Sequence, residues 1–391
     1  MQAVLRRLNH GAKMNTSSEM PNFLGRRQLL AGFGATAALG ACSGTARRAA
    51  IKRPPLDRDP LARFRLFADA SQQKWEDHLA KPAAGLKLRV LALSSGGEEG
   101  AFGAGAMVGW SATGTRPDFD IVTGISIGAL IAPFGFIGSS VDAELKRIFT
   151  DFGTEDIVKF SPFNGLFRQA LYDTTKLDQL ITRSTPIEFI DRVAARHASG
   201  SRLFIVTSEL ETARASVWDM GEIALAGEYT LFRAIMRASA ALPGLFSPVD
   251  LKFTANGVTY SETHVDGGVH MQFLAIPAFA FTTAHHREFP DGEIYLLINN
   301  TLDPAPVAVA RNPLAISQQA LTTFARASAL SSINATSLFA RANGLDLFVT
   351  SIDPKSGIVY DPSNRFSLPY MTELFEYGLE RGKSGTLWSR G

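Results

Sequence analysis

Ser126 lies in the run Gly124-Ile125-Ser126-Ile127-Gly128, which suits a nucleophilic serine. A serine hydroxyl attacks a carbonyl group only when its oxygen is exposed and a base takes its proton. Small residues two positions before and after the serine permit the tight strand-to-helix turn that exposes this oxygen. The N-terminus of the following helix adds partial positive charge that favours a developing alkoxide. We therefore expect Ser126 to be the nucleophile of a hydrolase.

A second glycine-rich run, Ser95-Gly96-Gly97-Glu98-Glu99-Gly100, lies between an expected strand and an expected helix. Backbone amides at such a turn can stabilise the oxyanion of a tetrahedral intermediate. A structural turn with a capping box from Ser95 to Glu98 would explain the same residues and is compatible with catalysis. The run lacks the Gly-Lys-Ser/Thr of a P-loop and a well-placed G-x-G-x-x-G, which disfavours a nucleotide site.

The base that serves Ser126 is less evident from the residues alone. Seven histidines are present and none follows His286, whereas hydrolases of the Ser, Asp, His order carry their histidine late in the chain. His264 and His270 flank Val265-Asp266-Gly267-Gly268, and His285 and His286 follow. Two glycines after Asp266 indicate a tight turn that another group can approach closely, or an Asp-Gly turn with no chemistry.

Four ordered blocks resemble the patatin-like phospholipase family over most of residues 86–390. The blocks are Ser95 to Gly100, Gly124 to Gly128 with Ala129-Leu130, the run from Ala238 to Val249, and Asp266-Gly267-Gly268. Four blocks in the right order are far more specific than any one of them. The resemblance implies a three-layer α/β/α fold with a central, mostly parallel sheet. It also implies that the chain is a carboxylic ester hydrolase acting on lipids.

The resemblance assigns roles to four residues. Ser126 attacks an ester carbonyl, Asp266 takes its proton without a histidine, and Gly96 and Gly97 offer the oxyanion N–H groups. Water then hydrolyses the acyl-enzyme, and the reaction needs no cofactor.

Two departures from the family pattern lie in the glycine loop. The family usually has a third glycine where Ser95 stands and Arg or Lys where Glu99 stands. We expect Glu98 and Glu99 to point to solvent and to suit the start of the helix. If they line the site instead, they would disfavour anionic head groups.

The elements that must position these residues follow an alternating strand and helix pattern from residue 86 onward, typical of a layered α/β sheet. We expect strands over residues 88–93 and 120–123, each followed by a helix, over 101–110 and 126–136. Further helices are expected over 143–152, 176–197, 229–239 and 313–343, and further strands over 203–208, 216–220, 293–299 and 345–351. Ligand sites in such sheets lie beyond the carboxyl ends of strands, where both glycine turns fall.

Composition suits one large globular domain or two small ones and gives no sign of a nucleic-acid partner. The 391 residues are 46% apolar and 19% charged, which is ample for a buried core. The formal charge of +2 arises in residues 1–41, which hold five Lys or Arg and one acidic residue, and the remainder is near −2. No His, Cys, Asp or Glu cluster has metal-ligand spacing, and adjacent His285 and His286 would point apart. The sequence does not set an oligomeric state.

The first 41 residues are expected to be an export signal. Arg26-Arg27-Gln28-Leu29-Leu30 resembles a twin-arginine signal, and residues 29–41 are uncharged but shorter than the ~20 residues that span a bilayer. Leu39-Gly40-Ala41-Cys42 resembles a bacterial lipobox, with Cys42 as the lipidated residue. An ordinary export signal with a chance cysteine is the alternative.

We expect three segments: a signal over 1–41, a lipidated tether and linker over 42–85 with a short helix over about 60–78, and a catalytic domain over 86–391. The membrane partner would be reached through Cys42. Ser43, rather than Asp, suits an outer-membrane lipoprotein facing the periplasm. The favoured function is a lipid acyl hydrolase of the phospholipase A, lysophospholipase or esterase type. The rivals are a histidine-dependent α/β-hydrolase esterase using Ser126 with His270 or His286, and a catalytically inactive envelope lipoprotein.

Overall fold

A computed structural model describes residues 59–79, 87–157, 159–160, 172–255, 257–281, 292–303, 309–361 and 364–391. The predicted signal, Cys42 and most of the tether lie outside these residues. The boundaries at residues 41 and 85 therefore stay predictions.

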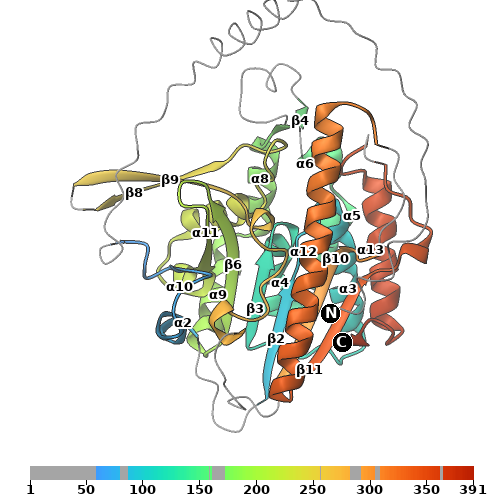
Figure 1. The fold of residues 1–391 in the computed structure, drawn as a ribbon, viewed down its shortest axis with the longest axis horizontal. Helices are drawn as coiled ribbons and strands as arrows, with labels where there is room; N and C mark the ends of the chain where they lie inside the picture. The colour runs from blue at the N-terminus through green and yellow to red at the C-terminus, as the bar shows by residue number, and fades with distance from the viewer. Residues whose placement is uncertain are drawn as a thin grey trace, which may run out of the picture. The chain divides into compact units, whose positions relative to one another are not determined.

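One large sheet organises the described residues (Figure 1). Its path runs β1-β7-β6-β3-β2-β10-β11-β12, and β9 pairs with both β6 and β8. The five central strands β6, β3, β2, β10 and β11 are parallel to one another, and the remaining pairs are antiparallel. This confirms the predicted α/β class with a central, mostly parallel sheet. The strands are β1 (Arg65–Phe67), β2 (Leu88–Leu93), β3 (Ile121–Ile125), β6 (Arg202–Glu209), β7 (Arg214–Asp219), β8 (Val249–Ala255), β9 (Val258–Asp266), β10 (Gly292–Thr301), β11 (Asp346–Ile352) and β12 (Ser389–Arg390).

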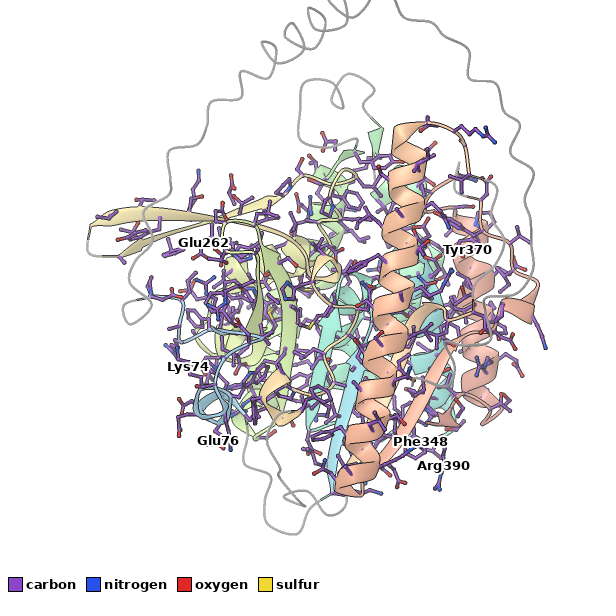
Figure 2. All side chains as sticks on the ribbon, in the orientation of Figure 1. Lys74, Glu76, Glu262, Phe348, Tyr370 and Arg390 are labelled. Atoms are coloured by element: carbon purple, nitrogen blue, oxygen red, sulfur yellow. The ribbon has the colours of Figure 1, made fainter. Side chains whose placement is uncertain are left out.

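The central strands are apolar on both sides because helices cover both faces. Leu91, Leu93 and Leu297 point to one face, whereas Ala92 and Leu296 point to the other, and all five are fully buried. The edge strand β12 is short, and it pairs Arg390 with Phe348 of β11, which Figure 2 labels together.

The first face carries most of the helices. α3 follows β2 and α4 follows β3, as predicted, and α13 packs closely against α3. A Cβ atom on Gly105 of α3 would lie 1.9 Å from the carbonyl oxygen of Phe375 on α13, so the contact requires glycine. The helices of this layer are α3 (Gly100–Ala112), α4 (Ile127–Ile137), α5 (Asp142–Thr150), α8 (Thr175–Ser184), α9 (Ile187–Ala198), α10 (Met220–Leu225), α11 (Tyr229–Ser239) and α13 (Leu368–Lys383).

The second face is covered by fewer elements. α12 (Pro313–Asn343) packs Ala340 against β10 and β11. α2 (Gln72–His78) places Trp75 against Phe204 of β6, with ring centroids 6.1 Å apart. Two helical layers thus enclose the sheet. The short elements α6 (Thr154–Ile157), β4 (Lys159–Phe160) and β5 (Tyr172–Asp173) lie outside it.

Two element predictions are wrong. Residues 60–78 form β1, which pairs with β7, and the short helix α2, rather than one helix. The helix predicted over 176–197 is two helices, α8 and α9, separated at Thr185 and Pro186. Pro186 has no amide hydrogen and restricts the residue before it to extended backbone, which ends α8. The β8–β9 hairpin was not predicted.

Candidate active site

Ser126 occupies the sharp turn between β3 and α4, as predicted. Its backbone has φ 57° and ψ −122°, a conformation that residues other than glycine rarely adopt. This strain costs on the order of 1–3 kcal/mol. A Cβ atom on Gly124 would lie 2.4 Å from the carbonyl oxygen of Gly128, and one on Gly128 would lie 2.4 Å from that of Leu93. Both glycines are therefore needed for the turn to form.

Asp266 is the last residue of β9, and its side chain meets Ser126. Ser126 Oγ donates to Asp266 Oδ2 at 2.6 Å, and the other carboxyl oxygen accepts from the amide of Gly268 at 2.7 Å. Burial raises the pKa of Asp266 to about 7, although both hydrogen bonds act in the opposite direction. A carboxyl group with a pKa near neutrality can both accept and return a proton at pH 7.

Strand β6 brings these two residues together. β3 runs along one edge of β6 as far as the pair Ile125 and Val206, and β9 continues along that same edge from the pair Asp266 and Thr207. The ends of β3 and β9 therefore meet beside consecutive residues of β6. Their meeting point places the Ser126 hydroxyl and the Asp266 carboxyl against each other.

Ser239 links the backbone of the Ser126 turn to β6. Its hydroxyl accepts from the amide of Ser126 at 3.0 Å and donates to the carbonyl of Val206 at 2.7 Å, and it is fully buried. Ser239 is the last residue of α11, and β8 begins at Val249. The block from Ala238 to Val249 thus joins α11 to β8, and its Ser239 also holds the backbone of the nucleophile.

Gly96 and Gly97 lie between β2 and α3, as predicted. Both are half-buried, and their amides donate to no backbone or side-chain acceptor in the described part of the chain. Amides at the start of a helix commonly lack partners and are suited to bind negative charge. These two amides are available to an oxyanion.

Ser95 ties this glycine turn to the Asp266 turn. Its amide donates to the carbonyl of Gln272 at 2.9 Å, and its hydroxyl donates to the Gln272 side chain. The side-chain amide of Gln272 then donates to the carbonyl of Gly268 at 2.8 Å. The serine that replaces a family glycine therefore links the two turns that flank Ser126.

Glu98 does not point to solvent, so that prediction is wrong. Its carboxylate is buried and accepts two hydrogen bonds from Arg365, at 2.6 and 2.7 Å. A buried carboxylate requires a partner of this kind, because a charged group that is removed from water without a partner loses a large solvation free energy. Burial alone would lower the pKa of Arg365, but the hydrogen bonds and charge of Glu98 raise it above its ordinary value.

Glu99 lies beside this ion pair and is only partly covered. Burial, and then the charge of Glu98, raise the pKa of its carboxyl group. Its carboxyl oxygen and an Arg365 nitrogen both lie within 4 Å of the position that a Cβ atom on Gly97 would occupy. The chain thus places a guanidinium group beside the glycine turn, where the family has a basic residue within the turn.

The described histidines do not contact Ser126. His264 is buried, with its ring nitrogens 2.9 Å from Thr207 Oγ1 and 3.3 Å from Glu262. Glu262 also binds Arg65, which makes His264 part of a structural polar network on β9, where Figure 2 labels Glu262. His270 is exposed at the end of the Asp266 turn, and His285 and His286 lie outside the described residues.

Three contributors to the site were not found from the sequence. Gln272 and Ser239 carry no local signal, although Ser239 lies within a quoted family block. Arg365 lies 267 residues after its partner Glu98, so only a search for a cation to match the two adjacent glutamates would have suggested it.

The described residues hold neither a metal-binding cluster nor a membrane-spanning helix. No group of three or more His, Cys, Asp or Glu side chains there is arranged to hold a metal ion. None of the described helices combines the length and hydropathy needed to cross a bilayer.

One of three comparisons with known proteins agrees with the family resemblance. Residues 91–279 match the family model described as patatin-like phospholipase. A comparison with curated proteins returned no significant match. Among solved structures, the crystal structure of VipD from Legionella pneumophila is similar at 11% identity, covering 80% of this chain and 68% of that chain, with a TM-score of 0.33.

Proposed function

We propose, from the premise that residues 91–279 are a patatin-like phospholipase domain, that the chain hydrolyses acyl esters of lipids with Ser126 as nucleophile and Asp266 as base. The family supports lipid acyl hydrolysis in general. The contact between Ser126 Oγ and Asp266 Oδ2, 2.6 Å long at a strained turn, is the observation that carries the finer assignment.

The proposed reaction has two displacements. Ser126 Oγ attacks the ester carbonyl carbon while its proton passes to Asp266, and the amides of Gly96 and Gly97 hold the oxyanion. Collapse of the tetrahedral intermediate breaks the bond to the alcohol oxygen, and Asp266 returns the proton to that oxygen. Water then attacks the acyl-enzyme with Asp266 again accepting a proton, and the fatty acid leaves as Ser126 is regenerated.

A fluorophosphonate probe followed by peptide mass spectrometry tests the nucleophile. We expect the probe to label Ser126 in the wild-type chain, and Ser126→Ala and Asp266→Asn to lower ester turnover on the order of a thousandfold or more. His270→Ala is the matched control and should retain turnover. Folded protein in which Ser126 stays unlabelled would favour the inactive lipoprotein, and loss of turnover in His270→Ala would favour a histidine-dependent esterase.

We also propose that the chain is exported and anchored through a lipidated Cys42 to a bacterial outer membrane, facing the periplasm. The proposal rests on the lipobox-like run that ends at Cys42. Labelled palmitate should enter the wild-type chain and not Cys42→Ala. Equal incorporation into both would contradict it.

A further inference from the structure

The N-terminal half of α12, residues 313–328, exposes large apolar side chains. Ile316, Leu321 and Phe324 are 54%, 61% and 63% exposed. Among the described side chains of α12, the first buried one is Ala329, and Ala340 packs on the sheet near the other end. Leu330 and Leu338 in the second half are also exposed, at 41% and 68%, so apolar exposure extends along the helix. Ile316, Leu321 and Phe324 form the group on the half that the sheet does not cover.

Helix and strand lengths explain why this half is uncovered. α12 has 31 residues and extends about 46 Å, whereas β11 beside it has 7 residues and extends about 23 Å. About half of the helix must therefore extend past the strand. Figure 1 shows α12 continuing beyond the ends of β10 and β11.

The uncovered half lies toward the edge of the sheet that carries Ser126. α12 ends at Asn343, and β11 begins at Asp346 and runs parallel to β10 and, through β2, to β3. Because only Gly344 and Leu345 separate the end of α12 from the start of β11, α12 must end near the amino edge of the sheet. Its first half therefore lies at the carboxyl edge, where Ser126 follows β3.

The charge of this region is one-sided. Residues 304–345 contain Arg311, Arg326 and Arg341 and no Asp or Glu, although the chain average of 37 acidic residues in 391 would place about four there. Arg326 lies in the first half of α12 and Arg311 just before it, whereas Arg341 lies in the last turn. Exposed Phe and Leu side chains beside arginines, with no acidic group, are complementary to an anionic lipid surface. Isolated apolar residues on a surface are ordinary, but a group of this size on one helix marks an interaction site.

We propose that the first half of α12 is a membrane-contacting helix that inserts Ile316, Leu321 and Phe324 into the interface of an anionic bilayer. Arg311 lies two residues before the first residue of this helix and meets the lipid phosphates. This contact is distinct from the Cys42 anchor and presents the carboxyl edge of the sheet to lipid. The proposal adds a membrane-binding surface to the proposed ester hydrolysis. Vesicle binding through this surface can be measured without ester turnover.

A fluorescent label at a single position gives a direct test. Cys42 is the only cysteine, so Cys42→Ala frees the full chain for labelling at an introduced site. Phe324→Cys carrying an environment-sensitive nitrobenzoxadiazole group should brighten and shift to the blue with vesicles of phosphatidylglycerol and phosphatidylcholine. Leu225→Cys on α10, 51% exposed in the native chain, is the matched position and should not respond.

Paired substitutions test the energetic contribution in the same Cys42→Ala background. Leu321→Ser with Phe324→Ser should weaken vesicle binding on the order of tenfold or more, because both lose apolar contact with lipid. Ile187→Ser with Leu225→Ser removes apolar side chains of similar exposure elsewhere, 49% and 51%, and should bind as the parent does. Arg311→Gln should weaken binding to anionic vesicles about fivefold and leave binding to neutral vesicles unchanged.

Three results would overturn the proposal. They are an unresponsive label at position 324, equal binding by the two double variants, and a double variant on α12 that converts a dimer to a monomer without changing vesicle binding. The last result would make this face a contact between two copies of the chain. Hydrolysis of a soluble short-chain ester is measured in parallel, so that failure of membrane contact is distinguished from failure of the proposed catalysis.

Discussion

At the scale of single residues, the charge beside the glycine turn is set by groups far apart in the chain. Glu98 and Glu99 bring two carboxyl groups to the start of α3, where negative charge would oppose an oxyanion. Arg365 neutralises Glu98 through two hydrogen bonds, and the raised pKa of Glu99 favours its neutral form. The local charge is therefore compatible with oxyanion binding despite the acidic sequence.

This ion pair predicts that substitutions at Glu98 and Arg365 have strongly non-additive effects on the free energy of unfolding. Arg365→Gln should lower the free energy of unfolding by about 3–5 kcal/mol, because it leaves the Glu98 carboxylate buried without its cation. Urea denaturation of the two single variants and the double variant Glu98→Gln/Arg365→Gln measures the coupling. The double variant should be more stable than Arg365→Gln alone.

An exposed pair provides the comparison for this cycle. Arg147 donates to Glu144 at 2.8 Å on the surface of α5, with side chains 51% and 30% exposed. Arg147→Gln should cost no more than about 1 kcal/mol, because water and side-chain entropy offset an exposed ion pair. Equal losses in Arg147→Gln and Arg365→Gln would show that Glu98 does not depend on its partner.

The candidate site was predictable where its residues lie in short local patterns. Ser126, Gly96 and Gly97 lie in turns whose backbone requirements are visible in five or six consecutive residues. Asp266 needed the family resemblance, because an Asp-Gly-Gly run alone also fits a turn without chemistry. Arg365 and Gln272 act through side-chain contacts across the fold, and no local spacing encodes such contacts.

At the scale of elements, α11 and β6 fix the nucleophile turn through one hydroxyl group. Ser239→Ala removes the acceptor for the Ser126 amide and the donor to Val206. We expect the free energy of unfolding to fall by about 1–3 kcal/mol, because two buried backbone groups lose a partner. Ester turnover should fall about tenfold or more, because the strained turn loses its support.

A buried serine with no such role serves as the control. Ser208 lies on β6 itself, is buried, and its hydroxyl has no hydrogen-bond partner among the described residues. Ser208→Ala should change stability and turnover little. If Ser239→Ala and Ser208→Ala behave alike, the contact to the Ser126 amide does not support the turn.

The element predictions succeeded where hydrophobic periodicity is strong. The central strands are continuous apolar runs because both of their faces are buried, and the helices that follow β2 and β3 begin at glycine turns. The break between α8 and α9 was missed although Pro186 marks it. The β8–β9 hairpin was also missed, although residues 249–255 alternate polar and apolar and Asn256-Gly257 is a typical hairpin turn.

At the scale of the whole molecule, buried carboxyl groups make stability depend on pH. Burial raises the pKa values of Asp219 and Asp266 to about 7 each. The folded chain then binds more protons than the unfolded chain between pH about 4 and 7, so stability falls as pH rises through this window. Glu262 acts oppositely, because hydrogen bonds from His264 and Arg65 outweigh its burial and lower its pKa to about 2.

Burial also lowers the pKa values of His78, His197 and His264, so their contribution to stability rises with pH below about 6.5. Comparing thermal unfolding of the wild-type chain with that of Asp266→Asn therefore isolates the contribution of Asp266. The Asp266 contribution to the free energy of unfolding should fall on the order of a few kcal/mol from pH 4 to 7, and the Glu262 contribution should be lost below pH 4 as Glu262 is protonated. Asp266→Asn should flatten the first decline, whereas Asp118→Asn, at an exposed residue, should leave it unchanged. Parallel pH profiles for the wild-type chain and Asp266→Asn would contradict the buried-carboxyl account.

The shared edge of β6 also bears on how chains of this design can change over evolutionary time. The sequence separation of 140 positions between Ser126 and Asp266 does not set the distance between the two side chains, because β3 and β9 each take their position from β6. Insertions and deletions in the connecting helices and hairpin can therefore accumulate while the hydroxyl and carboxyl groups stay in register. Lineages could diverge widely in size and surface in this region and still inherit the same pair of reacting groups.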